Sequence, residues 1–490
     1  MSASRIIAVA NGDGIGPEIM ATTLNVFKAA KVPLEYEFVE MGHHLFDKGI
    51  SRGMTDAAVA SVEKHGILFK GPMETPKGGG GMSINVTARK MWGAFANQRH
   101  FRSLPGVETV FSRAGKKIDL LIVRENIEDC YGGIEHRLSP DVTLSRRLIT
   151  APGSHQVHEN AFEVARKMGF KDIACGHKAN IMKFTDGLFL NLFRETAQRY
   201  PDLNSRDIIV DDLCMKLVMA PEKFQVLVLP NLQGDIVSDL CAGLVGGLGF
   251  APSSNIGERI SIFEAVHGTA PDIAGQNKAN PTALLMAGIM MLRHLGLVRQ
   301  AALIENALMV TLESGVHTGD FGDSKIPTSG TLEFGTAIIK NLGKKPTTVP
   351  ARDENEATET KTQVPLPVPS NRVLVYQQAT AEIVGADFFI ESHDNPEDIA
   401  QVAQPLGGDL FNLSVMANRG TQVWPKGSKF TELVDVYCLR FEKKAAIKRP
   451  LDQKDIMALT QRTSETFMLQ SLEVLRNFDG QRGYTLVQGQ

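Results

Sequence analysis

The chain has little cysteine, no long hydrophobic run and almost no net charge. Its five cysteines among 490 residues are scattered and never spaced as CxxC, which argues against a disulfide framework or a cysteine zinc site. A formal net charge of −3 offers no overall attraction to nucleic acid or an acidic membrane, so we expect neither as a partner. The longest apolar run, 283–292, is too short to span a bilayer and predicts a buried helix. An apolar strand begins by Ile6 and leaves no room for a signal peptide.

The first two thirds of the chain alternate between strand-like and helical patterns. A helical pattern over 155–169 is typical of the segments between the strands, and this alternation predicts an α/β domain with a largely parallel sheet. The turn GDGIGP (12–17) does not match GxGxxG, so an ordinary Rossmann fingerprint is absent. Strand-like runs occur at 67–71, 119–124, 172–177, 207–212 and 224–230.

The last third of the chain differs in composition. The segment 344–371 contains five prolines, many Thr and Glu and no aromatic residue, which predicts a linker. Beyond it, several strand-like runs precede a segment over 455–478 that we interpret as one apolar helix. These patterns predict a C-terminal α+β module of ordinary domain size.

Three arginines lie near the ends of predicted elements: Arg89, Arg99 and Arg124. Guanidinium groups bind carboxylates through paired, charge-assisted hydrogen bonds, so three of them suit a polycarboxylate ligand. Ser83 and Asn85 alternate along the chain and can face one side of an extended loop. The alternative, three solvated surface arginines, is the commoner arrangement for such residues taken singly.

A second set of residues suits a divalent metal and proton transfer. Asp235 and Asp239 are four residues apart, on one face of a helix, and Asp211 is expected at the end of an earlier strand. Three carboxylates suit Mg²⁺ or Mn²⁺. Lys178 follows a predicted strand and could transfer a proton there, as could the phenol of Tyr131. Helix capping, solvated charges and simple packing are the alternatives for each residue alone.

In their order along the chain, these residues fall within long motifs. From residue 12 to residue 343 the chain resembles the decarboxylating dehydrogenases of isocitrate and isopropylmalate. NRGTQVWP (418–425) and RNFDGQRGYT (476–485) also resemble the C-terminal extension of a long isocitrate dehydrogenase subgroup. The motifs of the main resemblance are GDGIGPE (12–18), KGPMETPKGGG (70–80), RENIEDCYGGIEH (124–136), HKANIMKFTDG (177–187), NLQGDIVSD (231–239) and HGTAPDIAG (267–275).

The resemblance implies an α/β fold of the isocitrate/isopropylmalate dehydrogenase type rather than a Rossmann fold. It implies a large domain, a small domain with a clasp, and a C-terminal α+β domain joined through the linker. The expected ranges are 1–95 and 246–343 for the large domain, 96–245 for the small domain, about 129–152 for the clasp, 344–371 for the linker and 372–490 for the C-terminal domain.

The segment around residues 83–99 distinguishes the substrates of this family. Isocitrate dehydrogenases have Ser-x-Asn-x-x-x-Arg there, as this chain does with Ser83, Asn85 and Arg89, whereas isopropylmalate enzymes present apolar contacts to an isopropyl group. A hydroxyl and an amide suit a γ-carboxylate. The resemblance therefore implies isocitrate as substrate, with Ser83 and Asn85 on its γ-carboxylate and Arg89, Arg99 and Arg124 binding its carboxylates.

The resemblance also implies the reaction: oxidative decarboxylation of isocitrate to 2-oxoglutarate and CO₂ in the tricarboxylic acid cycle. Asp235 and Asp239, with Asp211 of the partner subunit, would bind Mg²⁺ or Mn²⁺, which acidifies the C2 hydroxyl before hydride transfer. Tyr131 would protonate the enolate left by CO₂ loss, supported by Lys178 of the partner subunit. Lys178 and Asp211 would also help to remove the hydroxyl proton. A site drawn from two chains implies a homodimer with shared active sites, or a higher oligomer.

The loop over 267–281 is expected to wrap the adenosine end of a dinucleotide. NADP enzymes of bacterial type have Lys-Tyr where this chain has Asp272 and Ile273. A carboxylate suits the 2′,3′-diol of NAD and repels the 2′-phosphate of NADP in a partly desolvated groove, so we predict NAD as the cofactor. The residues expected to bind NAD are Thr75, Glu264, His267, Gly268, Thr269, Ala270, Asp272, Ile273 and Asn280.

Two alternative functions stay open. A related NAD-dependent dehydrogenase of homoisocitrate or 3-isopropylmalate is disfavoured by Ser83 and Asn85. A non-catalytic regulatory subunit is disfavoured because the arginine, lysine, tyrosine and aspartate sets are all present. The expected location is the cytoplasm if the source is bacterial and the mitochondrial matrix if it is eukaryotic.

Overall fold

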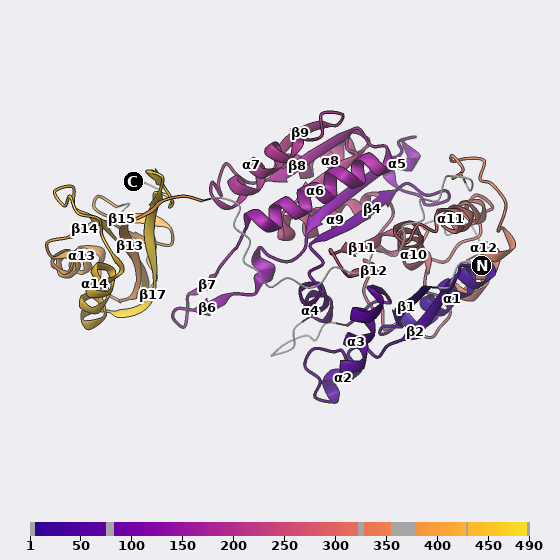
Figure 1. Cartoon of the computed structure of the whole chain (residues 1–490), viewed down its shortest axis with the longest axis horizontal. Helices are drawn as coiled ribbons and strands as arrows, with labels where there is room; N and C mark the ends of the chain where they lie inside the picture. The colour runs from indigo at the N-terminus through magenta and orange to yellow at the C-terminus, as the bar shows by residue number, and fades with distance from the viewer. Residues whose placement is uncertain (1–4, 75–82, 322–327, 354–377, 428–429, 488–490) are drawn as a thin grey trace. The chain divides into compact units, whose positions relative to one another are not determined.

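The computed structural model describes residues 5–74, 83–321, 328–353, 378–427 and 430–487. It divides into two compact units (Figure 1). Among the described residues, no helix is long and apolar enough to cross a membrane. The first unit comprises 1–131, 149–180 and 186–372, and the second comprises 132–148, 181–185 and 373–490.

A ten-stranded sheet crosses the first unit in the order β2-β1-β3-β12-β11-β4-β5-β10-β8-β9. Two parallel sets of strands are joined in the middle by β11 and β4, which run antiparallel to their neighbours. The predicted α/β class is therefore confirmed. The strands are β1 (Arg5–Ala10), β2 (Leu34–Phe38), β3 (Ile67–Lys70), β4 (Ala96–Arg102), β5 (Asp119–Glu125), β8 (Asp172–His177), β9 (Asn204–Ile209), β10 (Val226–Leu229), β11 (Pro252–Ile256) and β12 (Ser261–Ala265).

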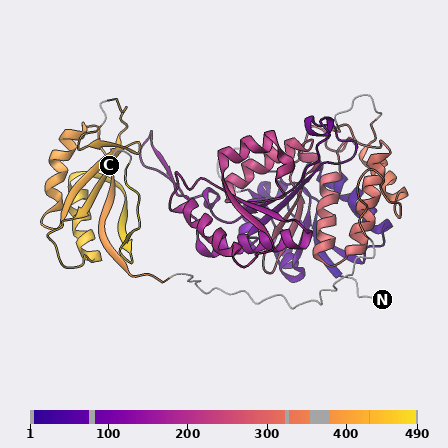
Figure 2. The same cartoon turned by 90° about the horizontal axis from the view of Figure 1, so that it is seen from above.

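Helices cover both faces of this sheet (Figure 2). The apolar run 283–292 lies in α10 and is almost wholly buried, as its composition predicts, and the pattern over 155–169 lies in α6. The helices are α1 (Gly16–Ala29), α2 (His44–Asp47), α3 (Asp56–His65), α4 (Ile84–Met91), α5 (Val110–Arg113), α6 (Ala151–Met168), α7 (Thr185–Ala197), α8 (Val210–Met219), α9 (Asn231–Leu244), α10 (Thr282–His294), α11 (Val298–Glu313) and α12 (Thr331–Lys340).

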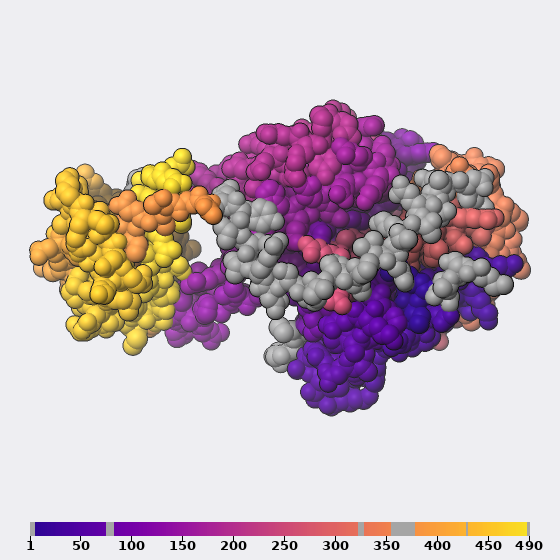
Figure 3. Space-filling view, in the orientation of Figure 1, coloured from indigo at the N-terminus to yellow at the C-terminus, as the bar shows by residue number. Residues whose placement is uncertain are grey.

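The predicted boundaries between a large and a small domain fall inside this continuous sheet. In Figure 3 the indigo N-terminal elements lie below the magenta elements that include β8, α7 and α8. The division into large and small domains stays a prediction. The start of the predicted linker lies against α11, where the Glu313 carboxylate accepts hydrogen bonds from the backbone N–H groups of Thr347 and Thr348. Residues 354–371 lie outside the described residues.

The second unit contains a six-stranded antiparallel sheet in the order β15-β14-β16-β13-β17-β18, with two helices packed on its apolar side. A hairpin of β6 (Glu135–Arg137) and β7 (Thr143–Ser145), within the predicted clasp, belongs to the same unit. This sheet confirms the predicted C-terminal α+β module. Its elements are β13 (Ala381–Glu391), α13 (Pro396–Ala403), β14 (Phe411–Asn418), β15 (Thr421–Trp424), β16 (Val436–Lys443), α14 (Gln453–Thr466), β17 (Met468–Phe478) and β18 (Gln481–Arg482).

The prediction of one helix over 455–478 is wrong in its second half. Helix α14 ends at Thr466, Phe467 has extended backbone angles, and the rest of the segment forms strand β17. Strand β17 pairs antiparallel with β13 along its whole length, and Leu472 and Val474 pack against the core of this unit. Pairing with a strand about 90 residues away in the sequence overrides the local apolar pattern, which does not distinguish a helix from a strand.

Candidate active site

Three of the sequence motifs meet at the ends of β1, β3 and β12. The backbone N–H of Asp13 donates to the carbonyl of Pro72 at 2.8 Å, and that of Ile15 donates to the carbonyl of Thr269 at 2.9 Å. Gly14 between them has φ +57°, and a Cβ there would lie 2.1 Å from the Thr269 carbonyl oxygen. Only glycine allows this approach. The turn GDGIGP therefore supports the loop HGTAP, although it is not a Rossmann fingerprint.

The loop that follows β12 carries most of the predicted nucleotide ligands. Burial lowers the pKa of His267, so its ring is neutral, and its Nε2 is enclosed without a partner in the described part of the chain. Ala270 has a left-handed φ of +37°, a strained conformation that is concentrated at functional loops. Asn280 donates to Asp320 at 3.0 Å, and the charge of Asp320 opposes the lowering of the His267 pKa without overcoming burial. Thr75 lies outside the described residues.

Asp320 is a neighbour of this loop that the sequence analysis missed. Its carboxylate accepts a hydrogen bond from the Thr318 hydroxyl at 2.6 Å in addition to that from Asn280. No local pattern marks it, because it comes 40 residues after Asn280 and folding alone brings the two side chains together.

A buried cluster of arginines surrounds Asp235 on α9. Arg99 on β4 lies 3.3 Å from Asp235 and 3.4 Å from Asp239, and Arg124 on β5 forms an ion pair with Asp235. The Tyr131 hydroxyl donates to the other Asp235 oxygen at 2.5 Å. The Arg124 side chain is only 1% exposed, so the alternative of solvated surface arginines is wrong for this residue and for buried Arg99.

Burial and the surrounding charges set the protonation states of this cluster. Burial, followed by repulsion from Arg99 and Arg89, lowers the pKa of Arg124 to about 10, so it stays protonated at neutral pH. Burial opposes ionisation of Asp235, but Arg124 and Arg99 outweigh it and lower the pKa of this carboxyl. Burial and the hydrogen bond to Asp235 raise the pKa of Tyr131, which keeps its proton. The cluster thus presents cations and a phenol that can donate a proton.

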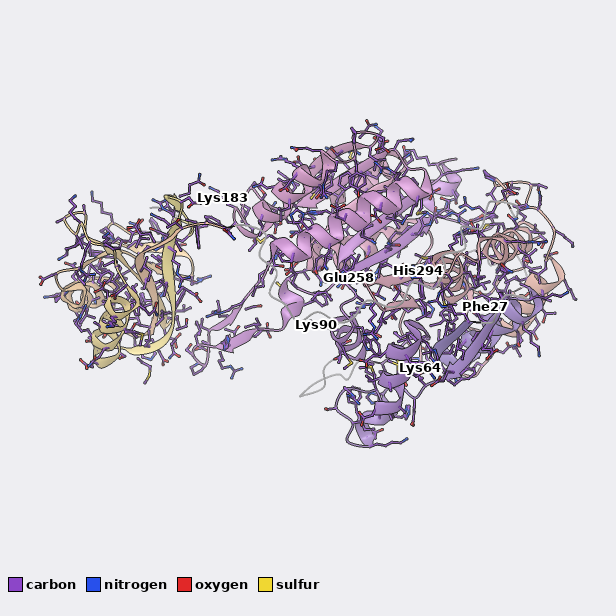
Figure 4. The ribbon with its side chains drawn as sticks, in the orientation of Figure 1. Phe27, Lys64, Lys90, Lys183, Glu258 and His294 are labelled. Carbon is purple, nitrogen blue, oxygen red and sulfur yellow. The ribbon has the colours of Figure 1, made fainter. Side chains whose placement is uncertain are left out.

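Helix α4 supplies the third arginine. Ser83 is the N-cap residue of α4, and Asn85 and Arg89 are four residues apart within it. The Arg89 guanidinium binds Glu264 at 2.8 Å, while Arg89 Nε and the Asn85 side-chain oxygen are enclosed without partners among the described residues. Buried polar atoms of this kind are normally hydrogen-bonded, so Arg89 Nε is available to donate to a ligand and the Asn85 oxygen to accept from one. Lys90, labelled in Figure 4, donates to the carbonyl of Tyr131 at 2.5 Å and ties α4 to the Tyr131 turn.

Lys178 and Asp211 form a separate ion pair. Lys178 directly follows β8, as predicted, but Asp211 lies in the first turn of α8 rather than at the end of a strand, because β9 ends at Ile209. In the described part of the chain, no three His, Cys, Asp or Glu side chains lie close enough to hold a metal. One chain therefore does not bring Asp211 together with Asp235 and Asp239.

Two family models match this chain. The isocitrate/isopropylmalate dehydrogenase model matches residues 6–338, and the model of the bacterial isocitrate dehydrogenase C-terminal domain matches residues 381–490. The chain belongs to the isocitrate/isopropylmalate dehydrogenase family.

Several relatives of this family member match it over almost its whole length. The NADP isocitrate dehydrogenase of Thermus thermophilus is 43% identical over 99% of this chain and 96% of its own length. That of Rickettsia bellii is 38% identical over 99% of both chains. A mitochondrial regulatory subunit of the NAD isocitrate dehydrogenase of Dictyostelium discoideum is 47% identical over 68% of this chain and 92% of its own length. A crystal structure of a Thermus thermophilus protein matches with a TM-score of 0.90 at 43% identity, over 100% of this chain and 97% of that one.

The prediction of NAD as the cofactor is wrong, because the relatives that match the full chain of this dehydrogenase are named NADP enzymes. The prediction rested on repulsion between Asp272 and a 2′-phosphate in a partly desolvated groove. In the structure Asp272 lies in an exposed turn, where its backbone carbonyl accepts a hydrogen bond from Gln276. Water and salt screen an exposed carboxylate, so its repulsion of a phosphate is weak.

Proposed function

We propose that this family member catalyses the NADP-dependent oxidative decarboxylation of isocitrate to 2-oxoglutarate and CO₂. The observation that carries the proposal is the buried cluster of Arg99, Arg124 and Tyr131 around Asp235, because it combines carboxylate-binding groups with a protonated phenol. The names of the full-length relatives support both the reaction and NADP.

The charge of the cluster supports a tricarboxylate as substrate. Four cations, Arg89, Arg99, Arg124 and Lys70, pair with three carboxylates, which leaves an excess of one positive charge. The carboxylates are Asp235, Asp239 and Glu264. A tricarboxylate bound with one divalent cation has a net charge of −1, which neutralises the excess positive charge of the site. A dicarboxylate such as isopropylmalate bound with the same cation has no net charge and leaves that excess in place. Uncompensated buried charge is costly, so this balance favours isocitrate over isopropylmalate.

Most of the candidate residues have a role in this reaction. The three arginines bind the carboxylates of isocitrate, and Ser83 and Asn85 bind its γ-carboxylate, for which Arg89 Nε is available as an unpartnered donor. Tyr131 donates its proton to the carbon that loses CO₂. His267, Gly268, Thr269, Ala270, Ile273 and Asn280 contact the nucleotide, which accepts the hydride when bound.

Asp235 and Asp239 suit a divalent metal. Both are hard oxygen ligands on one face of α9, and the Asp239 side chain is 59% exposed, with Arg99 at 3.4 Å as its ion-pair partner. With Asp211 of the partner subunit, they would hold Mg²⁺ or Mn²⁺. A metal bound there would supply a Lewis acid that acidifies the C2 hydroxyl.

The surface of α8 and α9 supports a homodimer. These helices pack against each other and present large apolar side chains to solvent, among which Ile236 is 61% exposed. Large exposed apolar side chains on neighbouring helices are typical of subunit interfaces. Asp211 lies in the first turn of α8, and we propose that a partner docked on this surface brings its own Lys178 and Asp211 near Asp235. The exposed apolar residues are Met215, Val218, Met219, Leu232 and Ile236.

Substrate and metal are tested by initial rates of NADP reduction with isocitrate, homoisocitrate and 3-isopropylmalate, each with Mn²⁺ and with excess chelator. We expect the highest kcat/KM with isocitrate and no turnover in chelator, because the arginine cluster matches a tricarboxylate and the C2 hydroxyl needs a Lewis acid. Preference for either other acid would contradict the proposed substrate, and full activity in chelator would contradict the metal.

Shared active sites are tested by mixing two inactive chains, Tyr131→Phe and Lys178→Ala. In a shared-site heterodimer, one site combines an intact Tyr131 with an intact Lys178, so random mixing should restore about a quarter of wild-type activity. If both residues acted within one chain, every site would carry a defect and no activity would return.

We propose a cytoplasmic location, since the full-length relatives named above come from bacteria.

A further inference from the structure

The turn that carries Tyr131 is anchored by two carboxylates. Glu128 accepts a hydrogen bond from the backbone N–H of Thr150, the N-cap residue of α6, at 2.9 Å. Asp129 is fully buried and accepts a hydrogen bond from the backbone N–H of Leu232, at the start of α9, at 3.1 Å. The first unit ends at Tyr131 and the second begins directly after it, so the position of the phenol depends on anchors such as these.

Asp129 bends the chain sharply just before Tyr131. Its backbone is left-handed, with φ +67°, a conformation that strains most residues other than glycine. Its side chain compensates for this strain, because Oδ1 accepts a hydrogen bond from the backbone N–H of Cys130 at 2.7 Å while Oδ2 accepts the one from Leu232. Strained residues persist where the surrounding structure fixes them, and they are concentrated at functional sites.

Helix α9 lacks an N-terminal cap of its own. Its N-cap residue is Pro230, which forms no side-chain hydrogen bond, and its first turn contains no acidic residue. The first N–H groups of a helix have no partner within the helix and carry a partial positive charge, so a carboxylate placed there is stabilising. Asp129 supplies it from 103 residues away in the sequence. Because α9 is itself held in the core by Val237 and Cys241, the turn is the part that moves when this bond is lost.

The bond between Asp129 and Leu232 closes a short ring of contacts around the phenol. Tyr131 comes two residues after Asp129, and Asp235 comes three residues after Leu232 in the same helix. The Tyr131 hydroxyl donates to Asp235 at 2.5 Å, which completes the ring. Both chain segments in the ring are short, so a shift of the turn at Asp129 moves the phenol relative to Asp235.

We propose that Asp129 is a positioning residue, which holds the Tyr131 phenol against Asp235 in the geometry that proton transfer requires. Its hydrogen bond to the start of α9 fixes the phenol before substrate enters. The effect on rate is expected to be large, because a misplacement of about 1 Å can slow catalysis by roughly 100-fold. This inference rests on the proposed isocitrate site and on Tyr131 as its acid.

The test is a double-mutant cycle in kcat, with Asp129→Asn and Tyr131→Phe made singly and together in the full chain. Asparagine tolerates the left-handed backbone but turns an NH₂ group toward one of the two backbone N–H donors. We expect Asp129→Asn to lower kcat by roughly 10- to 100-fold, while the calorimetric affinity for isocitrate with Mg²⁺ stays within about threefold. In the Tyr131→Phe chain the same substitution should change kcat by less than about twofold, because the group that it positions is already gone.

The matched control is Glu128→Gln. It also removes a carboxylate from a backbone N–H at the start of a helix, but on α6 rather than α9. It should lower the temperature of thermal unfolding while kcat stays within about twofold of the wild-type value. If Asp129→Asn does not fold, Asp129→Gly keeps the left-handed backbone without strain and should show the same loss of kcat.

Three results would overturn the inference. The first is an equal loss of kcat from the Asp129 substitution in the wild-type and Tyr131→Phe chains. The second is a folded Asp129 variant with wild-type kcat, and the third is an equal loss of kcat in Glu128→Gln. A wild-type chain without isocitrate-dependent NADP reduction would instead refute the proposed function.

Discussion

Replacing Tyr131 with phenylalanine removes one hydroxyl from the centre of the site. The hydroxyl donates to Asp235 at 2.5 Å, while the ring lies under the Arg124 guanidinium at 4.8 Å and the backbone carbonyl accepts from Lys90. Phenylalanine keeps the ring contact and the backbone bond. Tyr131→Phe therefore isolates the contribution of the phenolic proton.

The expected loss in kcat follows from the role of this proton. Because burial raises the pKa of Tyr131, the phenol is protonated at neutral pH and can act as an acid. Removing a general acid slows a reaction by roughly 100- to 10,000-fold, which corresponds to about 3–5 kcal/mol in the barrier. The KM for isocitrate should change little, since the arginines proposed to bind the carboxylates are intact. Asp235 keeps Arg99 and Arg124, so the unfolding free energy should fall by only about 1 kcal/mol.

Stopped-flow measurement of NADPH formation separates hydride transfer from protonation. Hydride transfer precedes CO₂ loss and protonation, so Tyr131→Phe should form NADPH in the first turnover faster than in the steady state. Steady-state kcat is measured on the same preparation, with thermal unfolding as the control for folding. A folded variant that retains more than a tenth of wild-type kcat would refute Tyr131 as the proton donor.

Two further predictions concern the interface and pH. Ile236→Asp places a charge on the exposed apolar face of α9, so light scattering should show a monomer and activity should be lost; an active dimer would contradict the interface. Burial, with repulsion from Glu128, raises the pKa of Glu125 from 4.5 to about 7. Protonated Glu125 therefore contributes fully to the free energy of unfolding below pH 4.5. This contribution is lost as the pH rises through 7, which lowers the free energy of unfolding by up to about 3 kcal/mol. Urea unfolding of Glu125→Gln should lack this dependence, and a profile that matches wild type would contradict it.

The sequence predicts those features that depend on local pattern. The apolar run of α10, the position of Lys178 after β8 and the shared face of Asp235 and Asp239 all follow from spacing within a few residues. The glycine-rich segment 12–17 likewise predicts the turn that joins strand β1 to helix α1.

Features set by distant contacts are not predictable in this way. The segment of β17 has an apolar pattern that also fits a helix, and only its pairing with β13 decides between the two. The partners of Glu264 come from three different elements, so its position in the sequence does not reveal them. The prediction of NAD assumed that Asp272 is partly buried, but it is exposed, and the residue type alone does not reveal how exposed a turn is.

The most direct test of the proposed function is the initial rate of isocitrate oxidation with NADP and with NAD, on the purified full-length chain with Mn²⁺. We predict isocitrate-dependent reduction with a kcat/KM for NADP well above that for NAD, because Asp272 is exposed and does not force a charge against the 2′-phosphate. A clear preference for NAD would contradict the cofactor assignment. The absence of isocitrate-dependent reduction with either nucleotide would contradict the enzyme itself.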